Sequence, residues 1–121
     1  MKLFEQIRQF ANGAEIIRDW LGDGAEIVPQ DEAQRRADIC IGCEFNVHGL
    51  KLTDTVATAI KETVEIKNHL QLRVRGEKSL GQCAICSCVC RLQIWCPVAY
   101  LNKYATEEDR AKYPGHCWKR G

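Results

Sequence analysis

Eight cysteines in a chain of 121 residues are the side chains of this sequence best suited to chemistry. Cys40 and Cys43 form one C-x2-C pair, and Cys83 and Cys86 form a second within the stretch CAICSCVC. A tight turn inside such a pair brings both sulfurs within reach of one zinc ion, at a zinc–sulfur distance of about 2.3 Å. Two such pairs from distant parts of a chain commonly build a tetrahedral zinc site. We therefore expect these four cysteines to bind one zinc ion.

The remaining cysteines leave the number of zinc ions open. Residues two apart in an extended strand lie about 6.5–7 Å from each other. Cys86 and Cys88 are therefore expected to serve different ions, unless the chain bends between them. Cys117 is the natural partner of Cys88 in a second site. One of three nearby side chains would complete that set: Cys90, Cys96 or His116. Two sites of four thiolates, and six thiolates bridging two zinc ions, both remain open.

Disulfides, an iron–sulfur cluster and thiol redox chemistry are the alternatives to zinc. The first 22 residues carry dispersed charges and no uninterrupted apolar core, so they do not form a secretory signal. Disulfides are rare in a cytosol, although a virion protein leaves the cell and its thiols can then oxidise. A redox C-x2-C motif usually belongs to a βαβ setting, which this sequence does not show. Cysteine spacing alone leaves an iron–sulfur cluster open.

Composition gives little support to enzyme, membrane or nucleic-acid classes. The net charge is +1, with 27% charged residues, so bulk electrostatics favours no such partner. No apolar run approaches the length that spans a bilayer. We find no paired carboxylates, Ser/His/Asp set or phosphate-binding loop at a telling spacing. A zinc ion held only by cysteines has no open coordination position for catalysis, so we expect a protein that is not an enzyme.

The first 22 residues are predicted to be a separate amphipathic helix. An apolar stripe recurs at three- and four-residue steps between residues 2 and 21. It contains Leu3, Ile7, Phe10, Ile17 and Leu21. The glycine-containing stretch GDGAEIVPQ then separates this helix from the rest. We expect 1–22 to dock on a protein partner and 27–121 to form a zinc-binding domain. The alternative is that the stripe packs within the same chain.

The zinc-binding domain is predicted to be mainly α-helical, with a small ribbon-like cysteine cluster. A helix over about 30–38 would carry the first cysteine pair at its C-terminal end. A long helix at about 52–74 is expected as an insertion between the two cysteine pairs. Alternation in VCRLQIW predicts a short β-ribbon near 89–95. Short helices are expected from Pro97 and from Thr106.

From Ala33 onward the chain resembles small cysteine-rich proteins encoded by bacteriophages and prophage-like regions. The resemblance is carried by AQRRADICIGCEFN, LGQCAICSC and the terminal HCW, and it covers about 27–118. It implies zinc binding and a phage setting, but no reaction. The cysteines that match are Cys40, Cys43, Cys83, Cys86, Cys88 and Cys117, and the other matching residues are Arg36, Asn46 and Trp118. Cys90 and Cys96 depart from the pattern, which more often has aliphatic residues there.

We therefore expect a non-enzymatic, zinc-stabilised structural or interaction protein of a phage. It would be made in the host bacterial cytoplasm and act in the virion or its assembly. A disulfide-stabilised virion protein is one alternative, and a zinc-knuckle module that binds nucleic acid is another. Basic residues near the cysteines support the last, but Glu65 and Glu77 lie among them. They are Lys67, Arg73, Arg75, Lys78 and Arg91.

Any complex of this chain with nucleic acid is predicted to be weak and to be lost steeply as salt rises. Three or four cationic contacts near Arg73, Arg75 and Lys78 would release only a few counterions. Fluorescence anisotropy with single- and double-stranded DNA and with RNA, repeated over a range of salt concentrations, measures this. A tight, salt-resistant and sequence-selective complex would favour the nucleic-acid module instead.

Overall fold

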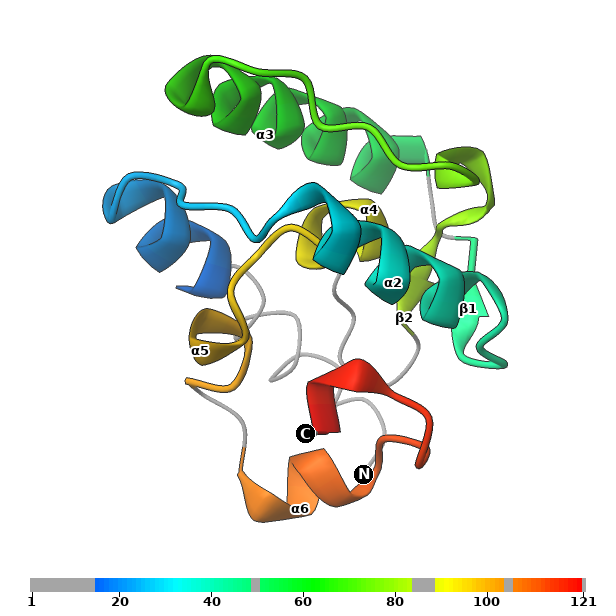
Figure 1. The fold of residues 1–121 in the computed structure, drawn as a ribbon. Coiled ribbons are helices and arrows are strands. Elements are labelled where there is room, and N and C mark those ends of the chain that lie inside the picture. Colours follow the sequence, from blue (N-terminus) through cyan, green and yellow to red (C-terminus); the bar gives the residue numbers. More distant parts are fainter. Residues whose placement is uncertain (1–14, 49–50, 84–88, 104–105, 121) are drawn as a thin grey trace.

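The computed structural model describes residues 15–48, 51–83, 89–103 and 106–120 (Figure 1). Residues 15–22 are helical. The helices that follow are α2 (Gln30–Ile41), α3 (Lys51–Asn68), α4 (Cys90–Gln93), α5 (Val98–Leu101) and α6 (Glu107–Ala111), with two short 3-10 helices, η1 (Glu77–Ser79) and η2 (Trp118–Arg120). The strands are β1 (Asn46–Val47) and β2 (Gln82–Cys83). The prediction of a mainly helical chain with a small β element is confirmed. That zinc stabilises the cysteine cluster stays a prediction.

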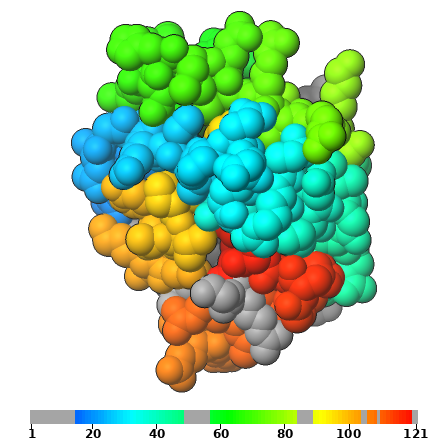
Figure 2. Space-filling view, in the orientation of Figure 1, coloured from blue at the N-terminus to red at the C-terminus, as the bar shows by residue number. Residues whose placement is uncertain are grey.

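The helices lie at three levels around the short helix α4. In Figure 1, α3 runs along the top, α2 and α4 lie below it, and α6 lies at the bottom near η2. Helix α4 contacts both α2 and α3, and α6 contacts η2. Figure 2 shows the surface of α2, in cyan, between the green segments around α3 and the red C-terminal segment. Within the described residues, no helix combines the length and apolar character needed to cross a membrane.

The two strands form one antiparallel pair at the edge of this arrangement. Asn46 lies opposite Cys83, and Val47 lies opposite Gln82. Gly81 makes this close approach possible, because a Cβ atom there would lie 2.1 Å from the carbonyl oxygen of Val47. Only glycine fits such a contact between backbones. The pairing brings Cys83 to the first residue of β1, close to the segment that follows α2.

The β-ribbon predicted near 89–95 is wrong. Residues Cys90–Gln93 form helix α4, and only Val89 makes an isolated bridge, to Gln82. The alternation of apolar residues was misleading because this segment is covered on all sides. Every residue from Leu92 to Cys96 is buried. A short run that is buried all round has no polar face, so its periodicity cannot separate a strand from a helix.

The long middle helix is shorter than the predicted 52–74, because α3 ends at Asn68. The Asn68 side chain donates to the carbonyl oxygens of Val64 and Ala25, at 2.9 and 2.8 Å. His69 then adopts a left-handed backbone conformation, with φ of 56°, which ends the helix. Helix α2 extends past the predicted end at residue 38, so Cys40 lies in its last turn. The prediction that the first cysteine pair lies at a helix C-terminus is confirmed.

Residues 15–22 contribute to the core of the same chain. Trp20 is fully buried and donates its indole N–H to the carbonyl oxygen of Glu26 at 2.6 Å, while Ile16 is 6% exposed. Ile17 and Leu21 of the predicted stripe are partly buried against this core. The rest of the stripe, Leu3, Ile7 and Phe10, lies outside the described residues. Docking of this helix on a partner therefore stays a prediction.

A buried arginine joins three parts of the fold. Arg36 of α2 is 5% exposed and pairs with Glu32 at 2.9 Å. Its Nη1 donates to the carbonyl oxygens of Ile94 and Cys96, at 3.2 and 2.9 Å. Its guanidinium also lies over the Trp118 ring, 4.3 Å from the centroid. Arg36 therefore fixes α2 against the end of α4 and against η2.

Arg36→Lys is predicted to lower the free energy of unfolding by about 2 kcal/mol, because an ammonium cannot reproduce this planar set of hydrogen bonds. Arg35→Lys is the matched control. Arg35 lies on the same helix and pairs with the same Glu32, but its side chain is 57% exposed. A change below about 0.5 kcal/mol is expected there. Urea denaturation of both variants measures the difference, and equal losses would contradict the role given to Arg36.

Candidate metal centre

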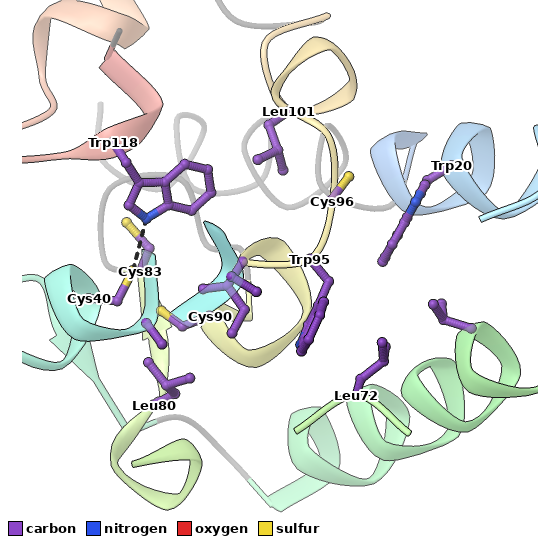
Figure 3. Close-up of a cluster of buried hydrophobic side chains, with 14 of the residues drawn as sticks. Trp20, Cys40, Leu72, Leu80, Cys83, Cys90, Trp95, Cys96, Leu101 and Trp118 are labelled. Atoms are coloured by element: carbon purple, nitrogen blue, oxygen red, sulfur yellow. Dashed lines mark hydrogen bonds between the residues drawn. The ribbon is translucent and has the colours of Figure 1, made fainter. Parts of the chain in front are cut away.

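Five cysteines from four segments line one small pocket. Cys40 and Cys43 come from the end of α2, Cys83 from β2, Cys90 from the start of α4, and Cys117 from the turn before η2. The space between them is about 20 Å³, which is enough for one water-sized atom. Figure 3 shows Cys40, Cys83 and Cys90 gathered on one side of the Trp118 indole. The fold therefore brings cysteines from distant parts of the sequence to the walls of one pocket.

The surroundings of Cys40 lower the pKa of its thiol. Its sulfur accepts a hydrogen bond from the Cys90 thiol, which is the main reason that its pKa is lowered to about 7. Burial opposes this change, whereas the Trp118 indole N–H, 3.3 Å from the sulfur, and the nearby positive charge of Lys119 lower the Cys40 pKa further. The same contact with Cys40, together with burial, raises the pKa of Cys90. Of these two thiols, Cys40 therefore gives up its proton more readily than Cys90.

Two buried polar side chains adjoin these sulfurs. Gln93 is 3% exposed, and its Nε2 donates to the Cys90 sulfur at 3.6 Å. Lys119 is 2% exposed, and its Nζ donates to Oε1 of Gln93 at 3.2 Å. The Lys119 charge also acts to lower the pKa values of Cys40, Cys90 and Cys117. A positive charge and an amide donor thus favour thiolates in a dry setting.

Asn46 fixes the positions of the two strands around the pocket. Its Oδ1 accepts the backbone N–H of Gly81 at 2.7 Å, and the Cys90 thiol lies 3.8 Å from the same oxygen. Its Nδ2 donates to the carbonyl oxygen of Ser79 at 2.8 Å. The backbone N–H of Cys90 in turn donates to the carbonyl oxygen of Gly81 at 2.8 Å. Cys83 and Cys90 are therefore held by one connected set of hydrogen bonds.

The pocket contains four of the six predicted zinc ligands: Cys40, Cys43, Cys83 and Cys117. The other two, Cys86 and Cys88, lie outside the described residues. His116 also lines the pocket, although its side chain is exposed. In the part of the chain that the structure describes, no three Cys, His, Asp or Glu side chains are arranged to hold a metal ion together. The number of zinc ions therefore stays open.

The donor set of the pocket suits zinc by its chemistry. Soft thiolates are the preferred ligands of structural zinc. N–H groups directed at ligand atoms are the usual outer support of such sites, and here Trp118 and Gln93 supply them to Cys40 and Cys90. The small volume admits a single ion.

The sequence offers Cys90 only as one of three side chains that could complete a second site with Cys88 and Cys117, and it indicates no role for Gln93 or Lys119. No spacing rule connects Cys90 with Cys40, because their approach depends on the bridge between Gln82 and Val89 and on the turn into α4. The contact of Trp118 with Cys40 does not follow from the sequence either, because it joins η2 to α2.

Comparison of the chain with protein-family models, with curated proteins and with solved structures finds no match. The phage resemblance therefore stays a prediction, and the geometry of the pocket carries the functional argument.

Trp118→Phe is predicted to raise the pKa of Cys40 in the reduced, metal-free protein, because the indole N–H that stabilises the thiolate is removed. The pH-dependent ultraviolet absorbance of thiolates measures this. The wild-type chain should show a step with a midpoint at about pH 7, and Cys40→Ser should abolish it.

Trp95→Phe is the matched control for this titration. Trp95 is 1% exposed, and its indole N–H has no hydrogen-bond partner among the described residues. Circular dichroism should confirm that each variant remains folded. If both tryptophan variants shift the step equally, the Trp118 hydrogen bond does not set the Cys40 pKa.

Proposed function

We propose that this chain is a non-enzymatic structural or interaction protein of a bacteriophage, with a fold stabilised by zinc at the cysteine-lined pocket. The observation that supports the proposal is that five cysteines from α2, β2, α4 and the C-terminal turn line one pocket of about 20 Å³. The phage setting rests on the resemblance in the cysteine framework. On that basis the protein is made in the host bacterial cytoplasm and acts in the virion or during its assembly.

Zinc would supply stability that the local elements lack. Helices α4 and α5 have four residues each and α6 has five, and isolated helices of this length do not form in water. Each strand has only two residues. Zinc binding contributes on the order of 10–16 kcal/mol to the folding of small zinc-finger peptides. An ion at the pocket would connect these short elements to the longer helix α2.

A structural role fits the pocket better than a catalytic one. A catalytic zinc keeps a coordination position open for water or substrate, whereas this pocket has five cysteines in its lining and room for a single water-sized atom. The larger surface groove lies between α2 and the segment 73–75. Asp31 and Asp38 line it together with Arg73 and Arg75. Because both positive and negative side chains line this groove, it suits a protein partner better than nucleic acid, which binds to clustered positive charge.

Protein purified under reducing conditions is predicted to contain at least one zinc ion per chain, and Cys40→Ser should lower that content. Elemental analysis together with a thiol count gives both numbers. Cys96→Ser is the control, because Cys96 is also buried but does not line the pocket. A chain that contains no metal, and whose cysteines are paired as disulfides when freshly isolated from a cytosol, would contradict the zinc proposal.

Removal of residues 1–14 is predicted to abolish association with phage particles while leaving the zinc content and a cooperative melt unchanged. This deletion tests docking better than removal of residues 1–22, which would also take Ile16 and Trp20 out of the core. Copurification of the tagged chain with intact particles, followed by immunoblotting, is the measurement. Undiminished association of the shortened chain would mean that another surface docks, and absence of the full chain from particles would contradict a virion role.

A further inference from the structure

Cys90 lies at the centre of the cysteine-lined pocket although the sequence pattern sets it apart. Its side chain is 1% exposed, and it contacts Cys40, Asn46 and Gln93. We infer that Cys90, together with Cys40, supplies a thiolate ligand to the zinc ion of this pocket. The inference rests on the proposed zinc site and specifies two of its ligands. On binding, the Cys90 S–H bond breaks, the proton leaves to solvent, and a zinc–sulfur bond forms.

The positions of the two sulfurs suit a shared ion. Two sulfurs bound to one tetrahedral zinc at about 2.3 Å lie about 3.8 Å apart. Cys40 and Cys90 both line the pocket, and Figure 3 shows their sulfurs on the same side of the Trp118 indole. An ion in this pocket would therefore lie next to both sulfurs.

The surroundings of Cys90 are those of a charged sulfur. Gln93 Nε2 donates to it, and Lys119 Nζ donates to the oxygen of the same amide. Both side chains are almost fully buried. Lys119 Nζ also lies over the Tyr113 and Trp118 rings, 4.6 and 5.9 Å from their centroids, so aromatic faces hold this buried charge beside the sulfurs. Beside zinc-bound thiolates, whose negative charge exceeds that of the ion, the same groups stabilise the site.

Cys96 is the comparison for Cys90, because it is a buried cysteine outside the pocket. It is also 1% exposed, but it does not line the pocket, and its backbone carbonyl rather than its sulfur accepts from Arg36. Figure 3 shows its sulfur well apart from those of Cys40 and Cys90. Burial alone therefore does not distinguish the two cysteines, whereas the contacts of the sulfurs do.

Cadmium-loaded wild-type protein gives a direct test that requires no substitution. An NMR correlation between an NMR-active cadmium isotope and cysteine β-protons identifies each ligand. Coupling to the β-protons of Cys90 and Cys40, and none to those of Cys96, is the expected result. Bound cadmium that couples to other cysteines but not to Cys90 overturns this inference and leaves the zinc proposal standing. A chain that binds neither cadmium nor zinc refutes both.

Matched substitutions provide the second measurement. Cys90→Ser should weaken zinc binding more than about 100-fold, because removal of a ligand exceeds the 10–100-fold loss typical of an outer-shell change. Cys96→Ser should change it by less than about tenfold. Competition with a chromophoric chelator measures both affinities. Equal affinities for the two variants would overturn the inference, and if Cys90→Ser does not fold, the cadmium spectrum of the wild-type chain decides.

Discussion

The buried guanidinium of Arg36 is the interaction on which the rest of this structure depends. It lies where α2, the end of α4 and η2 meet, and it contacts Ile94, Cys96 and Trp118. Its donors satisfy the carbonyl oxygens of Ile94 and Cys96 at a turn that is closed to water. Its face covers Trp118, and the indole N–H of Trp118 reaches Cys40. The position of the first cysteine therefore depends on an arginine in the preceding turn of the same helix.

The buried polar groups are concentrated on one side of the molecule. Trp20, Leu72 and Trp95 belong to an apolar core around α3 and residues 15–22, whereas Gln93 and Lys119 adjoin the sulfurs. A small domain has little apolar area with which to offset buried polar groups. Their concentration around the thiols fits a charged group in the pocket, such as a thiolate. Contacts with that charge would offset the free energy lost when the polar side chains are buried.

The pocket also constrains the backbone. Gly81 must lack a side chain because the carbonyl of Val47 occupies that space. The same residue donates to Asn46 and accepts from the backbone of Cys90. A substitution at Gly81 would therefore act on strand pairing and on the cysteine positions at once. Asn46, whose Oδ1 also lies 3.8 Å from the Cys90 sulfur, therefore links the strand pairing to the cysteine-lined pocket.

The sequence by itself determined the helical class and the helix end that carries Cys40, since spacing and periodicity are local properties of the chain. It did not determine the helix at Cys90–Gln93, because a segment buried on every side has no polar face to reveal its period. Nor did it determine the approach of Cys90 to Cys40 or the burial of Lys119. Those contacts join residues distant in sequence, and only the packing of α2, α4 and η2 brings them together.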